Sequence, residues 1–254
     1  MSYQQGLYPI IEKKAIAKNT FSFTILSPEI VKEAKPGQFV HVKCEGYFLR
    51  RPISICEINR EKGTLRIVFE IRGEGTEALS HLNAGDCVDM LAPLGNGFEI
   101  LSPDKKAVVV GGGIGVPPML EVAKQYQNPI AILGFRNASA VILEQDFQRI
   151  ARTMVSTDDG SYGQKGFVSD ILLDVLKEET PDILYACGPT PMLKVLKKIA
   201  LEHHLRLQVS LEERMGCGIG ACLVCACKTK KDGRESMRHV CKDGPVFEAE
   251  EVQF

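Results

Sequence analysis

Four cysteines near the end of the sequence constrain the fold more than any other feature. The segment ERMGCGIGACLVCACKT contains the spacing C-x4-C-x2-C, and a further cysteine follows after fifteen intervening residues. Plant-type [2Fe–2S] proteins use this spacing of three cysteines and a later fourth. The glycines between the cysteines allow a tight turn that brings backbone N–H groups close to an anionic cluster. The spacing predicts a [2Fe–2S] site with the ligands Cys217, Cys222, Cys225 and Cys241.

Two alternatives to an iron–sulfur site stay open for these cysteines. A structural zinc ion is the main competitor, although zinc sites usually show two separated C-x2-C pairs or a mixture of cysteine and histidine. A group of free, buried thiols is the second alternative. Cys227 fits neither ligand pattern, and we expect it to be a neighbouring thiol.

The composition excludes several classes of function. The chain has 254 residues, enough for two domains and a small module, and a formal net charge of -1. A near-neutral chain offers no basic face, so no nucleic-acid partner is expected. The first residues do not have the pattern of a signal peptide, and no stretch approaches the roughly 18 apolar residues of a membrane span. We expect a cytoplasmic protein without a membrane partner.

The first hundred residues have the pattern of a β domain. TLRIVFEIRG alternates its side chains with the period of two that a strand with two different faces requires. GQFVHVKC and GDCVDMLAPLG are further short strands between turn residues. This spacing predicts an antiparallel β-barrel over residues 1–101.

After residue 102 the pattern changes to alternating strands and helices. KAVVVGG, PIAILGF, RTMVST, DILYACG and LRLQVSLE are short apolar strands, and amphipathic segments such as TPMLKVLKKIALEHH lie between them. This alternation predicts a parallel sheet with helices on both faces, a Rossmann-like domain over residues 102–209. Residues 210–254 are left for the small iron–sulfur module, so the chain is expected to have three parts.

Two strand–turn–helix motifs lie in the α/β region. VVVGGGIGVPPM runs from a strand through Gly111, Gly112, Gly113 and Gly115 into a helix, whose N-terminus attracts phosphate. The third glycine of the strict dinucleotide motif is replaced by proline, so a simple tight turn is an alternative. In YACGPTPML, Cys187 ends a strand and is either near a bound nicotinamide or a buried strand-end residue.

Two motifs of the β domain favour a flavin. RRPISI offers a cationic Arg51 and the hydroxyl of Ser54 for a phosphate and a ring edge. RGEGTEAL places Gly75 and Thr76 at a helix start, a second site for an anion. An ordinary strand end and a capped turn are the alternatives.

Together, RPIS, GEGT, GGGIGVPPM and YACGPTPML resemble, in this order, the motifs of the ferredoxin–NADP reductase superfamily. The first two motifs of that superfamily hold FAD on a β-barrel, and the last two hold a nicotinamide nucleotide. With the C-terminal cysteine loop, the whole chain is similar to the electron-transfer subunits of class 1B dihydroorotate dehydrogenases of pyrimidine biosynthesis.

The resemblance implies the contacts of each cofactor. Since the gap before the fourth cysteine varies in such proteins, Cys241 is the least secure cluster ligand. The glycine turn would bind NAD, which is favoured over NADP because Arg136 stands alone after the second strand. The implied FAD contacts are Arg51, Pro52, Ile53, Ser54, Val68, Phe69, Glu70, Gly75 and Thr76.

The resemblance also implies an electron route. Electrons would come from FMN in a separate catalytic subunit, enter at the [2Fe–2S] cluster, collect on FAD and leave as hydride to NAD+. Two chains of each kind would form a heterotetramer. A flavin and iron–sulfur subunit of a ferredoxin-dependent NADP+ transhydrogenase or a sulfhydrogenase is the alternative, and a zinc-stabilised regulatory module is an alternative of another class. The five histidines show no metal spacing and are expected to be solvated or hydrogen-bonded.

Overall fold

The β domain is a closed antiparallel barrel, as predicted. The computed structural model describes residues 3–254. In the barrel, Phe23, Ile55 and Met90 are fully buried and belong to the same apolar core. Two short helices cover its rim, α1 (Pro28–Glu33) and α2 (Glu74–Ser80). The strand order is β1 (Gln4–Ala17), β2 (Thr20–Leu26), β5 (Thr64–Glu70), β4 (Arg51–Asn59), β3 (Phe39–Val42) and β6 (Cys87–Leu94), which closes on β1.

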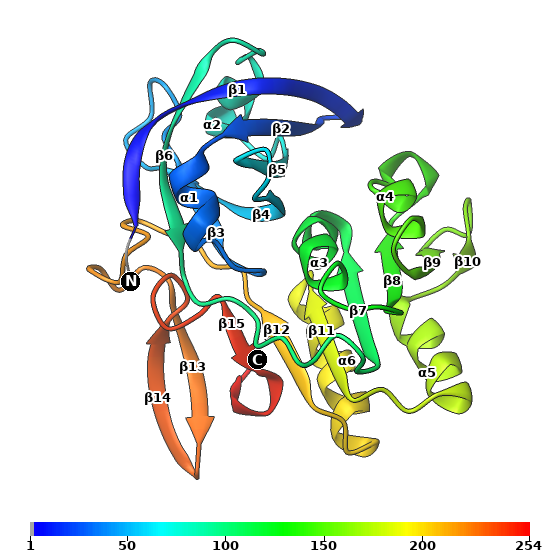
Figure 1. Ribbon diagram of the computed structural model, residues 1–254. Coiled ribbons are helices and arrows are strands. Elements are labelled where there is room, and N and C mark those ends of the chain that lie inside the picture. The colour runs from blue at the N-terminus through cyan, green and yellow to red at the C-terminus, as the bar shows by residue number, and fades with distance from the viewer. Residues whose placement is uncertain (1–2) are drawn as a thin grey trace.

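The α/β region is a seven-stranded sheet with helices on both faces (Figure 1). Helices α3 (Val116–Ala123) and α4 (Glu144–Gln148) cover one face, and α5 (Val168–Glu178) and α6 (Thr190–Glu202) cover the other. The order of the strands is β10 (Gln164–Lys165), β9 (Arg152–Thr157), β8 (Ile130–Phe135), β7 (Ala107–Gly112), β11 (Ile183–Cys187), β12 (Leu207–Ser210) and β15 (Val246–Glu248).

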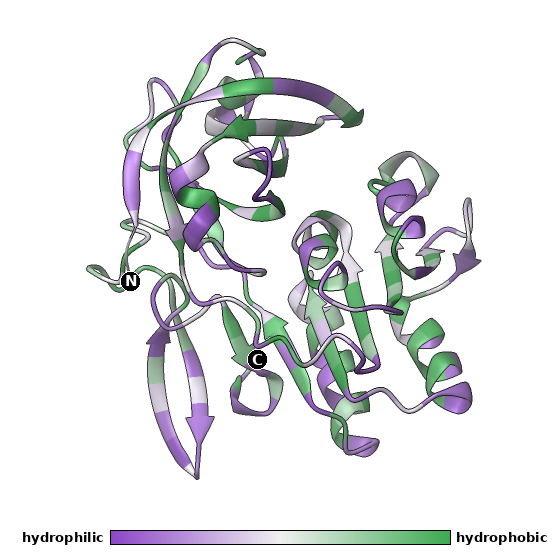
Figure 2. Ribbon diagram, in the orientation of Figure 1, coloured by the Kyte–Doolittle hydropathy of each residue, from purple (hydrophilic) through white to green (hydrophobic). Residues whose placement is uncertain are grey.

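The layers of helices on both faces of this sheet follow from its apolar strands. In β7, Val108 and Val110 join the core under α5 and α6, while Val109 joins the core under α3 and α4. A strand buried on both faces has the continuous apolar run that the sequence shows. Figure 2 shows the central strands as largely hydrophobic.

The C-terminal part differs from the expectation of a separate module. Strands β13 (Ala226–Lys231) and β14 (Arg234–His239) form a hairpin that projects away from both larger domains (Figure 1). The last strand, β15, leaves the hairpin and joins the edge of the seven-stranded sheet, antiparallel to β12. The boundary at residue 210 stays a prediction, since the two parts share one sheet.

The segment between the barrel and the sheet also contacts the C-terminal part. The Asn96 N–H donates a hydrogen bond to the carbonyl of Gly244 (2.6 Å), and its side-chain amide donates to the carbonyl of Lys242 (3.0 Å). The barrel and α3 are joined by the buried Glu121, whose carboxylate accepts a hydrogen bond from the N–H of Ile58 (2.8 Å). The three parts therefore pack on one another directly.

Three single turns of 3-10 helix complete the structure, η1 (Gly113–Gly115), η2 (Ala138–Ala140) and η3 (Ala249–Glu251). No helix within residues 3–254 combines the length and the apolar character needed to cross a bilayer.

Candidate functional site

The cysteine loop surrounds its sulfur atoms with backbone N–H donors. The Sγ of Cys217 accepts hydrogen bonds from the N–H groups of Ala221 (3.2 Å) and Cys222 (3.4 Å). The Gly220 N–H donates to the Sγ of Cys241 (3.1 Å), which lies 21 positions away in the sequence. Burial raises the pKa of the Cys217 thiol, but the backbone hydrogen bonds outweigh it and lower that pKa to about 6. The loop is therefore built to hold thiolates.

The four predicted ligands lie together as two pairs. The Cys222 N–H donates a hydrogen bond to the Sγ of Cys217 (3.4 Å), and the Cys241 N–H donates to the Sγ of Cys225 (3.5 Å). The second pair is the more deeply buried, with exposed fractions of 1% for both residues. Among residues 3–254, no three His, Cys, Asp or Glu side chains are placed as ligands of one single metal ion. Two pairs of thiols suit two irons with two ligands each, and the donor set fits a [2Fe–2S] cluster.

Cys227 stays outside this group. It is the second residue of β13, and burial together with the charge of Glu213 raises the pKa of its thiol to about 11. It is therefore a protonated neighbour of the loop.

The predicted flavin residues meet at the start of α2. A Cβ atom at Gly75 would lie 2.5 Å from Nη2 of Arg51, so the guanidinium lies directly over the first turn of this helix. The same guanidinium lies 5.7 Å from the centre of the Tyr47 ring. The hydroxyl of Thr76 accepts a hydrogen bond from the Arg72 N–H (2.9 Å) and thus caps the turn. Arg51 and the backbone of Gly75 could together hold an anion.

The remaining flavin residues lie along β4 and β5. Pro52 and Ser54 face outward, whereas Ile53 points into the barrel core and can offer only its backbone. In β5, Val68 is part of the apolar core of the α/β domain, which also contains Cys187. Cys56 of β4 belongs to the same core, so both strands contribute to the contact between the two domains.

The glycine turn lies at the switch point of the parallel sheet. The chain runs from β7 outward to β8 and β9, then crosses back to β11 on the other side of β7. Ligands of open α/β sheets bind at such a point, outside the carboxyl ends of the strands. A Cβ at Gly115 would overlap the carbonyl oxygen of Cys187, so the turns after β7 and β11 touch. Both predicted nucleotide motifs are therefore neighbours.

Cys187 itself is closed off from solvent. Its exposed fraction is 1%, and burial, with the nearby charge of Glu212, raises the pKa of its thiol. Glu212 also approaches Arg72 of the barrel, with 3.8 Å between Oε2 and Nη1. The end of β11 thus lies next to the contact between barrel and sheet, where a nicotinamide would meet a flavin. The thiol of Cys187 remains neutral there.

Two residues of this region were missed by the sequence analysis. Asp158 follows β9 directly and donates its backbone N–H to the carbonyl of Phe135 at the end of β8 (3.0 Å). His41, expected to be solvated or hydrogen-bonded, is fully buried, and the backbones of Arg50 and Cys217 lie within hydrogen-bonding reach of its ring. Burial and the charge of Arg50 lower the pKa of His41 to about 4. The acidic TDDG after a strand could have revealed Asp158, but nothing in GQFVHVKC distinguishes a buried histidine.

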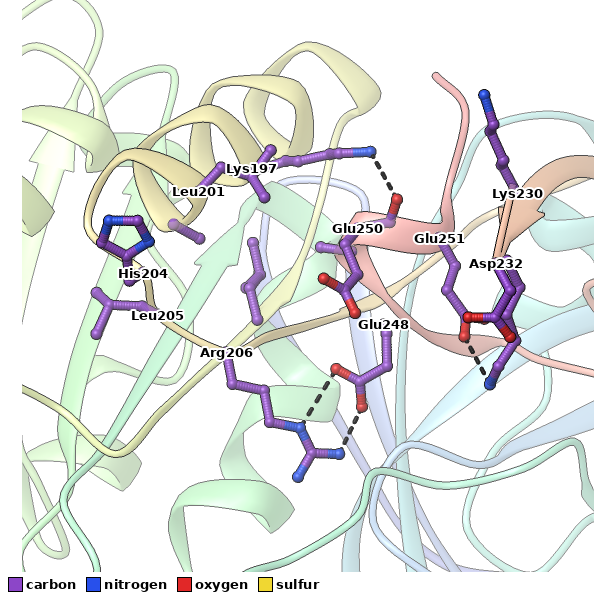
Figure 3. Close-up of a pocket in the computed structure, with 14 residues that line it drawn as sticks. Lys197, Leu201, His204, Leu205, Arg206, Lys230, Asp232, Glu248, Glu250 and Glu251 are labelled. Carbon is purple, nitrogen blue, oxygen red and sulfur yellow. Dashed lines mark hydrogen bonds and ion pairs between the residues drawn. The ribbon is translucent and has the colours of Figure 1, made fainter. Parts of the chain in front are cut away.

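A cavity of about 850 Å³ lies elsewhere, between α6, β12 and the C-terminal segment (Figure 3). Three of its cationic side chains already have partners. Arg206 contacts Glu248 (2.5 Å), Lys231 contacts Glu251 (2.9 Å), and Lys197 donates to a backbone carbonyl (2.7 Å). None of the predicted cofactor residues lines it, so it is not the functional site.

Comparison with known proteins agrees with this arrangement. Residues 212–253 match the family model described as the iron–sulfur cluster binding domain of dihydroorotate dehydrogenase B. Two curated relatives are named dihydroorotate dehydrogenase B (NAD(+)), electron transfer subunit. The one from Caldanaerobacter subterraneus is 44% identical over 88% of this chain and 89% of its own length. The one from Streptococcus mutans is 44% identical over 96% of both chains.

Solved structures extend the comparison to the fold. A chain of the NADH-dependent reduced ferredoxin–NADP oxidoreductase structure is 34% identical, with a TM-score of 0.88 over 98% of this chain and 90% of that one. Phthalate dioxygenase reductase is 17% identical, with a TM-score of 0.63 over 93% and 77%, and shares the fold alone. The predicted barrel, α/β domain and iron–sulfur region are confirmed.

Proposed function

Because the chain belongs to the family of electron transfer subunits of dihydroorotate dehydrogenase B (NAD+), we propose that it carries electrons from a catalytic subunit to NAD+. The observation that carries this proposal is the grouping of four cysteines, linked by backbone N–H to Sγ hydrogen bonds, in a loop packed against the barrel. The chain is an oxidoreductase subunit that uses FAD and a [2Fe–2S] cluster.

Each predicted residue then has a task. The four cysteines hold the cluster, and Arg51 with the N-terminal turn of α2 holds the pyrophosphate of FAD. When bound, FAD holds one or two electrons and so connects the one-electron cluster to the hydride acceptor NAD+. The glycine turn after β7 lets the nucleotide approach the backbone, and Gly113 leaves the space for it, because a Cβ there would meet nothing within 4 Å. Buried Val68 and Cys187 exclude water where the two domains meet.

The dihydroorotate is oxidised, in this proposal, at FMN in the catalytic subunit. That subunit docks over the cysteine loop, where Leu223 and Val224 are 77% and 58% exposed although both are apolar. Exposed apolar side chains beside a redox centre suit a protein contact that brings the centres close and excludes water. Two subunits of each kind form a heterotetramer.

Analysis of the purified chain tests the cofactors. Flavin extraction should give FAD at one per chain, iron and acid-labile sulfide should be present at two each, and reduction should produce the EPR signal of a [2Fe–2S] cluster. A colourless protein that contains zinc and no flavin would establish the regulatory alternative instead.

Turnover tests the role as a subunit. The chain alone should reduce artificial acceptors with NADH and should not oxidise dihydroorotate, whereas its complex with the catalytic subunit should reduce NAD+ with dihydroorotate. Dihydroorotate oxidation by the single chain would remove the assignment. The 34% identity to the ferredoxin–NADP oxidoreductase chain favours a transhydrogenase subunit as the second candidate. The partner that co-purifies with the native chain separates these two.

A further inference from the structure

The turn that contains the fourth predicted ligand is bound by one residue of the segment between barrel and sheet. Asn96 lies in this barrel–sheet linker, residues 95–106, and its side-chain amide donates to the carbonyls of Lys242 (3.0 Å) and Asp243 (3.1 Å). Its backbone N–H donates to the carbonyl of Gly244 (2.6 Å). The three carbonyls that directly follow Cys241 therefore all accept hydrogen bonds from Asn96.

The N–H groups of the same turn are satisfied from its other side. Those of residues 242–244 all donate to the carbonyl of His239, over 2.7 to 3.3 Å. The N–H of His239 in return donates to the carboxylate of Asp243 (2.7 Å). The ligand turn, residues 239–244, is thus closed internally through its N–H groups. Its carbonyls are directed outward, and Asn96 attaches them to the rest of the structure.

The linker is itself fixed to the barrel beside this contact. The buried side-chain amide of Gln38, which directly precedes β3, donates to the carbonyl of Gly95 (2.7 Å). A Cβ atom at Gly95 would collide with Pro245, so the linker and the chain after the ligand turn also touch directly. Asn96 therefore attaches the ligand turn to a support that is anchored in the barrel core.

Cys241 needs such a support because of its place in the chain. The other three predicted ligands share one loop, whereas the hairpin β13–β14 separates Cys241 from them. The ladder of this hairpin ends with the pair of Ala226 and His239, two residues before Cys241. Groups that orient a metal ligand from outside the ligand set contribute to the affinity of the site. The hydrogen bonds from Asn96 are placed to do this for the fourth ligand.

We propose that Asn96 positions Cys241 for the cluster, and that it couples retention of the cluster to closure of the barrel–sheet linker. This inference rests on the proposed iron–sulfur site. Asn96 is a positioning residue, since it acts through the backbone that follows Cys241. The coupling is reciprocal, because a contact that favours the bound cluster is itself favoured when the cluster is bound.

Loss of the cluster to an iron chelator tests the positioning without any measurement of activity. The full chain, loaded with FAD and cluster, is mixed with excess chelator, and released iron and the visible absorption of the cluster are followed. Asn96→Ala should release iron about tenfold faster than the native chain, which is the lower end of the effect of residues that orient metal ligands. Asn96→Asp should also release iron faster, because its carboxylate has nearly the same shape but no N–H donor.

Asn83→Ala is the matched control for iron release. Asn83 is also an exposed turn residue, and its amide donates to the carbonyl of His81 (3.0 Å) within the barrel. Removal of this amide deletes a comparable hydrogen bond that has no connection to the ligand turn. The variant should release iron at the native rate.

Hydrogen exchange of the linker is the second readout, and a general loss of stability would not reproduce it. In the native chain, peptides that cover Asn96 should exchange about tenfold faster after the cluster is removed, a typical size for coupling between two sites. Peptides that cover the barrel turn at residues 83–86 should not change. In Asn96→Ala, the exchange of the linker should be nearly the same with and without the cluster. Mass spectrometry measures each peptide.

Three results would overturn the inference. These are equal rates of iron release in Asn96→Ala and Asn83→Ala, a native rate in Asn96→Asp, and linker exchange in the native chain that does not respond to removal of the cluster. If Asn96→Ala cannot be loaded with the cluster, Asn96→Asp and the exchange of the native chain still decide. A native chain that holds no iron and no sulfide would overturn the proposed function itself, which is a separate result.

Discussion

Two glycine-rich turns of this chain look alike in sequence but use their glycines differently. The nucleotide turn, residues 111–115, lies at the end of β7, and the cluster loop, residues 216–220, contains Cys217 and precedes the other three predicted ligands. In the nucleotide turn, a Cβ at Gly111 or Gly112 would collide with Val116 or with Met192. In the cluster loop, a Cβ at Gly218 or Gly220 would likewise collide, with His41 or with Lys242, and the N–H groups of Gly220 and the following Ala221 in addition point at sulfur atoms.

The difference shows what a glycine motif means in each place. Most glycines of the nucleotide turn are required by the packing of strand against helix, so they would be needed even without a nucleotide. Only Gly113 leaves open space, at a positive φ of 55°. The cluster loop, in contrast, also directs backbone N–H groups at the sulfur atoms of Cys217 and Cys241. A cysteine spacing therefore constrains chemistry more strongly than a glycine spacing does.

The largest expected effect comes from removing one cluster ligand. Cys217→Ser should abolish the EPR signal of the cluster and reduce dihydroorotate-dependent reduction of NAD+ by the complex to background, because the iron loses a thiolate. Reduction of an artificial acceptor by NADH should remain, since FAD is held by the barrel. Iron content, EPR and the two activities measure this.

Cys227→Ser is the control for that experiment. Its thiol lies outside the two pairs and is protonated, so the cluster and both activities should be retained. If Cys227→Ser lost the cluster while Cys217→Ser kept it, the contrast between the two turns would fail.

Substitutions in the nucleotide turn should separate packing from ligand binding. In Gly115→Ala, the new methyl group overlaps the carbonyl of Cys187, and we expect a loss of about 1–3 kcal/mol in unfolding free energy. In Gly113→Ala, the positive φ costs about 1–2 kcal/mol, but the methyl group enters open space. Chemical denaturation measures both.

The Michaelis constant for NADH completes this contrast. Relative to the loss of unfolding free energy in each variant, the Michaelis constant should rise more in Gly113→Ala than in Gly115→Ala. The reason is that the methyl group at Gly113 occupies the space assigned to the nucleotide. An unchanged constant in Gly113→Ala would place the nucleotide elsewhere.

A third glycine turn lies at the start of α2, and there a charged side chain packs against the glycine. Arg51→Ala removes the guanidinium that lies over Gly75, and we expect FAD to bind about 10–100-fold more weakly, the usual value of a hydrogen bond to a charged group. Flavin content after dialysis measures this. Arg149→Ala, whose side chain is 73% exposed, is the control and should retain FAD fully.

The sequence predicted the architecture well because its signals are local. Apolar runs that alternate with amphipathic helices define the α/β domain, and period-two strands define the barrel. The hairpin β13–β14 was missed, since its strands are short and mostly polar and lack a clear alternation of apolar residues. Its turn, Asp232–Gly233, has positive φ at both residues and is the typical signal of such a hairpin.

The rest of the site depends on contacts between distant segments. The pairing of β15 with β12 and the contact of His41 with Gly218 join residues that are far apart in the sequence. The periodicity and spacing within each of these segments do not indicate which distant segment it contacts. The grouping of the cysteines was predicted only because the C-x4-C-x2-C spacing is known to accompany one kind of three-dimensional site.

The smallest expected effect concerns the choice between NAD and NADP at the outer end of the nucleotide site. Asp158 lies where the carboxyl ends of β8 and β9 meet, and a carboxylate there accepts a hydrogen bond from a ribose hydroxyl and repels a 2′-phosphate. In Asp158→Ala we expect the ratio of kcat/KM for NADH to that for NADPH to fall about tenfold, which corresponds to about 1.4 kcal/mol. Asp174→Ala removes the same charge from the exposed face of α5 and should leave the ratio unchanged. An equal ratio in both variants would mean that the nucleotide stops short of β9, and the glycine turn would then be the whole of its site.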